Sequence, residues 1–354
     1  AFLSEQFASD ADVQCGTEFR QKPLWSAHPP NILSVQLPRK IEVGLMETDR
    51  LRIGDSREIL LHVTLVTALE RTPLQNESMK SQLSPSLHPA VALPIAHVDT
   101  AKQPGHWLLA SVGKRVLRPG GLELTKQLIK HLAPGPADDV VEFAPGLGGT
   151  ARMILAMRPR SYVGIERKPT VAQQLQLAIG DSNAHIVTAS AESTQLSSDS
   201  ASVVYGEAML SMQTPEQKRR IFAEAFRLLK PGGRYGIHEL ALLPDEIDES
   251  SRKAIEREMS MNIHVGVRPA TLAEWQYLLS EAGFQIEWQT SVPMHLLEPK
   301  RMLADEGIAG VLRIALSLLW KPAARRRVLS MRRMFRKHAS HLSAVAIVCV
   351  KPTR

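Results

Sequence analysis

The chain has 354 residues, of which 44% are hydrophobic and 22% are charged. These proportions are typical of a soluble globular protein that can bury a sizeable core. The formal net charge of +7 leaves nucleic acid, a membrane surface or an acidic substrate open as partners, although the excess of positive charge is concentrated between Arg313 and Lys337.

Cysteine usage and apolar runs exclude several classes of protein. The two cysteines, Cys15 and Cys349, lie near opposite ends of the chain, so neither a disulfide framework nor a thiolate metal site is expected. No apolar run is long enough to cross a membrane. Glu5 and Asp10 make the first residues unlike a signal peptide. We therefore expect a cytoplasmic protein without a bound metal.

Residues 1–97 carry no recognisable motif. Pro, Ser, Gln and His are scattered through 21–38 and 72–98, a composition typical of loops or disorder. Residues 41–46 fit a strand, and 55–69 fit either a helix or a strand. We expect a poorly ordered N-terminal extension or a small accessory region here, and one main domain over 98–354.

From residue 98 onward, apolar periodicity predicts helices and strands in alternation. The predicted helices are 108–116, 122–132, 151–157, 170–179, 215–229, 245–265, 271–282, 308–320 and 323–338. The predicted strands are 138–143, 162–166, 185–188, 202–206, 234–239, 284–292 and 343–350. Strands separated by helices of this length indicate βαβ units and a doubly wound parallel sheet.

A glycine-rich turn follows the first of these strands. Gly146, Gly148 and Gly149 allow a sharp turn and a close approach of the backbone to a ligand. The helix that follows offers free N–H groups and the positive end of its dipole. Such a turn at the carboxyl end of the first strand is typical of a nucleotide-type site, although a glycine turn can also simply close a βα connection.

Two later stretches favour the ligand site. Glu166 ends the second strand, 18 residues beyond Gly148, and a carboxylate there can accept hydrogen bonds from both hydroxyls of a ribose. The alternative is a surface glutamate paired with Arg167 or Lys168. Ala189–Glu192, after the third strand, forms a small polar turn that can line an adenine.

Four stretches together resemble class I S-adenosylmethionine-dependent methyltransferases of the small-molecule type. They are Val141–Gly149, Val163–Glu166, Ala189–Glu192 and Leu228–Gly233, the last being a Leu-Leu-Lys-Pro-Gly-Gly turn before the fifth strand. A nicotinamide-binding fold would require G-x-G-x-x-G spacing, whereas residues 146–151 are Gly-Leu-Gly-Gly-Thr-Ala. The resemblance therefore favours S-adenosylmethionine as the cofactor.

The resemblance implies a seven-stranded sheet with its last strand antiparallel, 343–350 being inserted beside 284–292. It also implies a cofactor site made of Glu142, Ala144, Pro145, Gly146, Gly148, Glu166, Arg167, Ser190, Ala191 and Glu192. The first residues of that set would surround the methionine moiety, Glu166 the ribose, and 190–192 the adenine. Related sequences often carry Asp where this one has Ser190, which implies a weaker adenine contact or one made by the backbone. Inserts at 241–270 and 296–342 would form a cap over the substrate.

Catalysis of methyl transfer depends mainly on alignment and desolvation, and a general base is needed only when the acceptor must lose a proton. The candidates at the ends of the fourth and fifth strands are Glu207, His238 and Glu239. An imidazole at 238 could take a proton, or it could be a hydrogen-bonded histidine without a catalytic role. Glu207 should meet a cation, a substrate donor or the cofactor. Arg118–Gly121 either supplies a cation to the cofactor carboxylate or simply ends a helix.

The acceptor class is inferred partly from missing motifs. No Asn/Asp-Pro-Pro-Tyr/Phe stretch follows the fourth strand, no cysteine stands there, and only Glu207 occurs where protein-arginine methyltransferases have two glutamates. A small-molecule acceptor remains, methylated at O, N, S or C. A set of large apolar residues would either line an apolar pocket or pack the core: Met259, Met261, Trp275, Met294 and Met302.

The apolar and basic segment 308–337 has three interpretations. A cap over the substrate pocket is favoured, peripheral membrane contact by a lipid or quinone methyltransferase comes second, and nucleic acid binding is the least favoured. A module that binds the cofactor without transferring methyl is a further alternative. The oligomeric state stays open.

Overall fold

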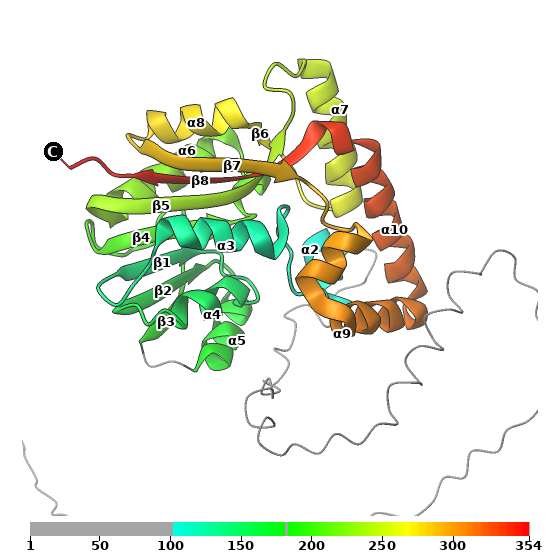
Figure 1. Ribbon diagram of the computed structural model, residues 1–354, viewed down its shortest axis with the longest axis horizontal. Coiled ribbons are helices and arrows are strands. Elements are labelled where there is room, and N and C mark those ends of the chain that lie inside the picture. The colour runs from blue at the N-terminus through cyan, green and yellow to red at the C-terminus, as the bar shows by residue number, and fades with distance from the viewer. Residues whose placement is uncertain (1–101, 181–182, 354) are drawn as a thin grey trace, which may run out of the picture. The chain divides into compact units, whose positions relative to one another are not determined.

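A single twisted sheet organises the part of the chain that the computed structural model describes, residues 102–180 and 183–353 (Figure 1). The prediction of an N-terminal extension over 1–97 lies outside the described residues. The strands are β1 Asp139–Phe143, β2 Ser161–Glu166, β3 Ala184–Thr188, β4 Ala201–Glu207, β5 Leu229–Leu242, β6 Ala270–Thr271, β7 Gln285–Pro293 and β8 Leu342–Val350.

The strand order is β3-β2-β1-β4-β5-β8-β7, with the short β6 paired to the end of β5. The neighbouring strands in the series β3-β2-β1-β4-β5 are all parallel, whereas β8 runs antiparallel to both β5 and β7. The prediction of a doubly wound sheet with an antiparallel last strand, 343–350 beside 284–292, is confirmed. Only β6 has no predicted counterpart, because two residues are too few to show a period.

The helices alternate with these strands. They are α2 Gly105–Ser111, α3 Gly121–Leu132, α4 Gly149–Leu155, α5 Pro169–Ile179, α6 Pro215–Leu228, α7 Glu249–Ile263, α8 Leu272–Glu281, α9 Pro299–Trp320 and α10 Pro322–Lys337, with the short 3₁₀ helices η2 Leu210–Met212 and η3 Ala339–His341. The predicted helix 108–116 was wrong in its bounds. The chain turns at Gly113, which has φ = 100°, so α2 begins and ends earlier.

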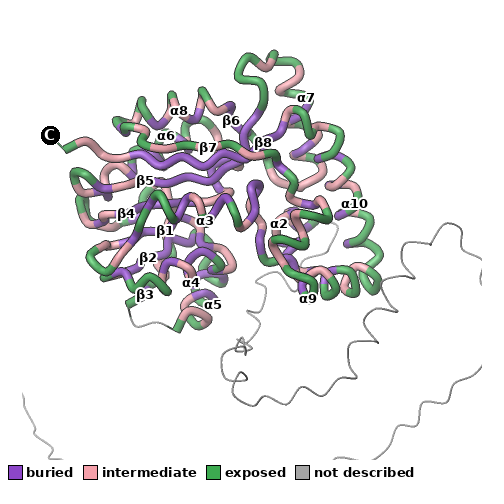
Figure 2. The backbone as a smooth tube through the Cα atoms, in the orientation of Figure 1, coloured by how far each residue is buried: buried purple, intermediate pink, exposed green. Residues whose placement is uncertain are grey.

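Alternating side chains of the strands build two cores, one on each face of the sheet. Val140 and Ala344 pack with α3 and α4 on one face, while Val141 and Val345 pack with α6 and α8 on the other. β8 is buried along almost its whole length, as expected for a strand with neighbours on both sides. Figure 2 shows the central strands β1, β4, β5 and β8 as mostly buried, whereas the edge strand β7 has no buried residue.

A third core lies beyond the carboxyl ends of the parallel strands. It joins α2, α7, α9 and α10, which we call the cap helices, and Figure 1 shows them grouped at one end of the sheet. Its buried members include Leu108, Met259, Ile314 and Met331. The segments predicted as cap inserts, 241–270 and 296–342, contain α7, α9 and α10. Ligands of open α/β sheets bind at this end of the strands.

Candidate active site

A cavity of about 590 Å³ lies between the carboxyl ends of the strands and the cap helices. The sheet side contributes the ends of β1, β2, β4 and β5 and the loops that follow them. The cap side contributes α2, α7, α10 and the segment after β7. A volume of this size is typical of sites for small molecules and cofactors.

The glycine-rich turn forms the floor of the cavity at the end of β1. Gly146 has φ = 55°, and a Cβ built on it would meet only the carbonyl oxygen of Ala144, at 3.9 Å. Gly148 has φ = 69°, and a Cβ there would come within 2.5 Å of Leu175. Gly146 therefore leaves room for a ligand, whereas Gly148 is required by packing against α5.

Glu142, the last residue but one of β1, is a buried carboxyl between two tyrosines. The hydroxyls of Tyr162 and Tyr205 both donate to its Oε2, the latter at 2.5 Å. Burial raises the pKa of Glu142 to about 7, although both hydrogen bonds act to lower it. The side chain lines the cavity, so a ligand cation placed beside it would favour its charged form.

Glu166 and the turn after β3 form the far end of the cavity. Glu166 accepts a hydrogen bond from the N–H of Lys168 at 2.9 Å, and burial raises the pKa of its carboxyl. Arg167 and the turn 189–192 also line this end. Glu192 points its carboxylate at Gln217 (3.0 Å) and Arg220 (2.6 Å), so it helps to hold this turn against α6.

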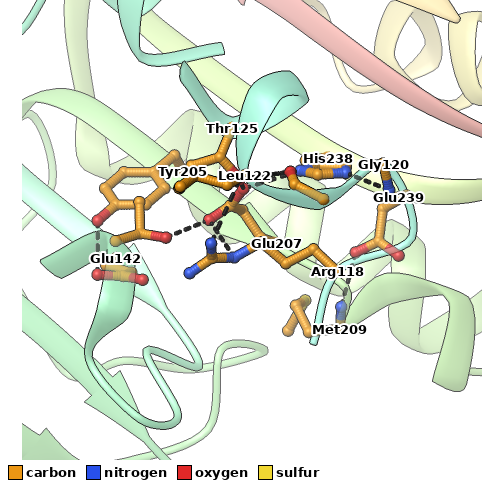
Figure 3. A network of polar contacts seen from close by, with 12 residues as sticks. Arg118, Gly120, Leu122, Thr125, Glu142, Tyr205, Glu207, Met209, His238 and Glu239 are labelled. Carbon is orange, nitrogen blue, oxygen red and sulfur yellow. Dashed lines mark hydrogen bonds and ion pairs between the residues drawn. The ribbon is translucent and has the colours of Figure 1, made fainter. Parts of the chain in front are cut away.

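Glu207 is the centre of a buried polar network at the end of β4 (Figure 3). Thr125 donates to its Oε1 at 2.6 Å, and Thr150, in the first turn of α4, donates to its Oε2 at 2.5 Å. Arg118 forms an ion pair with it at 3.0 Å. The segment 118–125 and the start of α4, which are both far from β4 in the sequence, are thus tied to one carboxylate.

The charge on Arg118 decides the ionisation of this carboxylate. Burial by itself would raise the pKa of Glu207, but Arg118 and the hydrogen bonds from His238 and Thr125 outweigh it and hold the pKa at about 2. Arg118 also reaches toward the glycine turn, because a Cβ on Gly149 would lie 3.2 Å from its terminal nitrogen. The prediction that Glu207 meets a cation agrees with this geometry.

His238, on β5, has both ring nitrogens engaged. The N–H of Gly120 donates to Nε2 at 3.0 Å, so Nε2 is the acceptor and Nδ1 carries the proton that it shares with Glu207 at 2.9 Å. The side chain is fully buried and does not line the cavity. This arrangement suits a residue that positions Glu207 and the loop before α3.

Glu239, the next residue, caps the short helix η2. The N–H groups of Met209 and Leu210 donate to its Oε1, both at 2.7 Å. The N–H and hydroxyl of Ser211 donate to its Oε2 at 3.1 and 2.7 Å. Burial raises its pKa, against these hydrogen bonds. Its four bonds hold the loop after β4, which lines the cavity.

Apart from His106 of α2, the cap side of the cavity is mainly apolar. Its lining includes Leu109, Met259, Ile263, Val267, Met294, Leu296, Met331 and Phe335. Of the large apolar residues singled out in the sequence, Met259 and Met294 line this chamber. Trp275 is buried in the core under α8, Met261 is 59% exposed, and Met302 packs against the core of the cap helices. For these three residues the pocket alternative was wrong.

Of the predicted site residues, all line the cavity except Gly148 and His238. Two further lining residues, His106 and Trp107, were not predicted. His106, in α2, has a pKa that burial and the charge of Lys168 lower to about 4, so its imidazole is neutral at pH 7. Trp107 lies under the Lys168 ammonium at 5.6 Å. Helix periodicity around 105–111 could have indicated a buried face but not its contact with the site.

No group of three or more His, Cys, Asp or Glu among residues 102–180 and 183–353 is placed to hold a metal ion. In the same part of the chain, no helix is long and apolar enough to span a membrane.

Comparison with known proteins identifies the family. A model described as a methyltransferase domain matches residues 140–233. An uncharacterised protein of Haemophilus influenzae is 33% identical over 214 residues, which cover 59% of this chain and 83% of that protein. The chain contains a methyltransferase domain of the class I, S-adenosylmethionine-dependent type. This methyltransferase is also 29% identical, over 136 residues, to an uncharacterised methyltransferase of Synechocystis, with 38% of this chain and 63% of the relative covered.

Solved structures share the fold of this methyltransferase. Phosphoethanolamine N-methyltransferase 2 of Haemonchus contortus, in complex with S-adenosylhomocysteine, superposes with a TM-score of 0.54 at 15% identity, covering 71% of this chain and 58% of that one. The cyclase SpnF superposes with a TM-score of 0.50 at 16% identity, covering 66% and 81%. At these identities the likeness concerns the fold alone.

The cavity fits the cofactor of this family. Gly146 leaves the space that a Cβ would fill, and the carboxyl of Glu142 lines the same cavity. Glu166 at the end of β2 offers a carboxylate for vicinal hydroxyls, and Arg118 offers a cation beside the glycine turn. The donor set therefore matches an amino acid joined to a ribonucleoside.

Proposed function

We propose that this methyltransferase transfers the methyl group of S-adenosylmethionine to a small, largely apolar acceptor molecule bound under the cap helices. The observation that carries the proposal is one cavity whose sheet side is polar and carries the cofactor motifs, while its cap side is lined by methionine and aliphatic side chains. Flexible methionines such as Met259, Met294 and Met331 adapt to an apolar ligand. The whole of 98–354 would act as one domain, with 241–270 and 296–342 as its substrate cap.

Each end of the cofactor has a partner in this assignment. Glu142 faces the ammonium of the methionine moiety, and Arg118 faces its carboxylate. Glu166 accepts hydrogen bonds from the ribose hydroxyls, and the turn 189–192 borders the adenine. Because Ser190 already accepts the N–H of Glu192 at 3.2 Å, the adenine contact would fall to the backbone and Ala191.

The bound cofactor supplies a methyl group on a sulfonium, which is a strong electrophile and leaves as a neutral thioether. The residues of the chain contribute alignment and a dry chamber. Neither His238, whose nitrogens are both engaged, nor Glu239, whose oxygens are both bonded, is free to remove a proton. The geometry therefore gives neither of these two residues the role of a base, and we assign an acceptor atom that is nucleophilic without them, such as a neutral amine.

Calorimetry tests the cofactor half of the proposal. We expect S-adenosylmethionine to bind, and Glu166→Ala to weaken its binding at least about tenfold because two charge-assisted hydrogen bonds are lost. NAD serves as the control nucleotide. Tighter binding of NAD than of S-adenosylmethionine would contradict the assignment.

The acceptor half requires methyl transfer itself. Purified protein is incubated with methyl-labelled cofactor and a fractionated small-molecule extract, and we expect label in an organic-soluble product. Protein boiled beforehand is one control, and Gly146→Val, which fills the cofactor space, is the other. Cofactor binding with no labelled product from any extract would favour a binding module without transferase activity.

A further inference from the structure

The second half of α9 presents an apolar stripe to solvent. The backbone leaves the helical region at Gly307, and beyond this break the exposed fractions are 71% for Ile308, 57% for Leu312, 57% for Leu316, 63% for Leu319 and 85% for Trp320. Their spacing of three, four and one residues places them on one side of a helix. Of the residues of α9, only Gly310 and Ile314 are buried, and Figure 2 shows much of the helix as exposed.

The segment that carries this stripe and the helix that follows it are strongly basic. The nine charged residues between 308 and 337 are all basic: Arg313, Lys321, Arg325, Arg326, Arg327, Arg332, Arg333, Arg336 and Lys337. No Asp or Glu occurs anywhere from 307 to 354. The side chains of Arg325, Arg326 and Arg333 are exposed, and they make no hydrogen bond or ion pair to any other residue within the described ranges. Their charges are therefore available to a partner.

The inner side of α9 is firmly attached to the domain. Arg313 donates to the carbonyl of Gly113 at 3.1 Å, and Lys321 donates to the carbonyl of Ser111 at 3.0 Å. Before the break, Glu306 forms a buried pair with Lys114 at 3.5 Å and accepts the N–H groups of Arg115 and Val116, both at 2.9 Å. The attachment fixes the rotation of the helix, so the apolar stripe stays on the outside.

We propose that the outer face of α9, together with the exposed arginines of α10, docks this protein onto an anionic lipid bilayer. A helix with aliphatic and Trp side chains on one face and basic side chains beside it is suited to lie at the headgroup boundary of such a bilayer. A second copy of the chain would bring two sets of like charges together. A nucleic acid would neutralise the arginines but leave the leucines and Trp320 without a partner.

Docking has a direct consequence for the acceptor. α10 carries exposed arginines on one side, while its Met331 and Phe335 line the apolar chamber on the other. A single helix thus separates the proposed lipid surface from the site of methyl transfer. This consequence rests on the proposed function, whereas docking itself does not and is tested without any activity measurement.

The test is co-sedimentation of the full chain with vesicles of phosphatidylcholine alone or mixed with phosphatidylglycerol. We expect binding to the mixed vesicles that falls as salt rises, and little binding to the neutral ones. Leu316→Ser with Leu319→Ser should lower the partition constant at least about tenfold, since two leucines no longer leave water. Arg325→Gln with Arg326→Gln should lower it by a similar factor.

Leu177→Ser is the matched control, because Leu177 is a 78% exposed leucine on α5, outside the cap helices. It should bind vesicles like the wild type. Trp320 provides a second readout, since its emission should shift to the blue on addition of mixed vesicles, and Trp320→Phe should remove that shift. Cofactor affinity by calorimetry should be unchanged in every variant, which shows that the fold is intact.

Three results would overturn the proposal. The first is failure of the full chain to bind mixed vesicles. The second is equal binding by the wild type and the stripe variants. The third is a concentration-dependent blue shift of Trp320 without lipid, which would make the stripe an interface between copies of the chain.

Discussion

Glu207 shows how one buried carboxylate can organise a site. It receives hydrogen bonds from α3 and α4, pairs with Arg118 and shares a proton with His238 on β5. These partners come from the segment 118–125, from the start of α4 and from β5. Glu207, together with the hydrogen bond from Gly120 to His238, therefore holds the loop before α3 to the sheet.

We expect Glu207→Gln to lower the free energy of unfolding by about 3 kcal/mol, since a pKa of about 2 in the folded state lies well below the ordinary value of 4.5. A carboxylate whose pKa is depressed stabilises the folded state fully above pH 4.5. The difference in the free energy of unfolding between the variant and the wild type should therefore shrink as pH falls from 4.5 toward 2. Denaturant titrations at several pH values measure it. Glu249→Gln is the control, because that glutamate pairs with Lys253 on the surface and should change little.

At the neighbouring histidine, we expect a positioning effect on the rate. His238→Leu should lower kcat/KM about tenfold or more by displacing Glu207 and the Gly120 loop. His238→Gln should recover part of the loss, because an amide can also accept from Gly120 and donate to Glu207. The shape of the pH profile should be the same in all three proteins. An acidic limb that disappears in both variants would instead make His238 a base.

Glu142 predicts a pH dependence of cofactor binding. Its pKa of about 7 means that the carboxyl is increasingly protonated below neutral pH, and a neutral carboxyl attracts the ammonium of the cofactor less. Affinity for S-adenosylmethionine should rise about tenfold between roughly pH 5.5 and pH 7. Calorimetry across this range measures the effect, and Glu142→Gln should flatten it. A dependence that persists in Glu142→Gln would assign it to another group.

Among the elements, the glycine turn and α9 each contain residues with two different roles. In both, residues that pack against the domain stand close to residues that face the cavity or solvent. Gly148 packs against Leu175, whereas Gly146 faces the cavity. In α9, the part before Gly307 is clamped to residues 114–116, and the part after it presents the apolar stripe. The same element therefore supports the site at one end and the proposed lipid contact at the other.

The two glycines should respond differently to substitution. Gly148→Ala should lower the free energy of unfolding by about 2 kcal/mol, from left-handed backbone strain and the contact with Leu175. Gly146→Ala should lower the free energy of unfolding by only about 1 kcal/mol. It should weaken cofactor binding more than Gly148→Ala does, because its methyl group enters the space of the ligand. Chemical denaturation and calorimetry separate the two effects. Equal losses of cofactor affinity would show that both glycines face the ligand.

Across the described part of the molecule, the cavity lies between two hydrophobic cores that are built from different residues. The sheet supplies one wall and the cap helices supply the other. A ligand in this position contacts both, so its binding should favour the state in which cap and sheet are packed together.

Thermal unfolding should therefore respond to the cofactor. S-adenosylmethionine at about 100 times its dissociation constant should add about 2.7 kcal/mol to the free energy of unfolding. The melting temperature should continue to rise with concentration, as measured by calorimetric scanning. NAD at the same concentrations is the control, and an equal shift with NAD would count against a specific site.

Sequence periodicity was sufficient for the sheet and for most helices, because apolar alternation and helical spacing are local properties. It failed for α2, where Gly113 ends the helix, for the first part of α9, which begins at Pro299 and not at Ile308, and for the two residues of β6. The cofactor motifs were also local, since each lies at the end of one strand. Glu142, Gly146, Glu166 and the turn 189–192 were predicted as cofactor residues from these motifs and from the family resemblance, and all of them line the cavity.

What the sequence by itself determined is the fold, the family and the cofactor motifs, because each depends on residues that are close together along the chain. Only the tertiary structure decided that His238 is enclosed between Gly120 and Glu207. It also decided that Gly148 packs against α5 and does not line the cavity, and that the leucines of α9 are exposed to solvent. These features depend on contacts between segments up to about two hundred residues apart, as between Arg313 and Gly113. No local pattern encodes such a contact, since packing against distant neighbours determines which face of an element is buried.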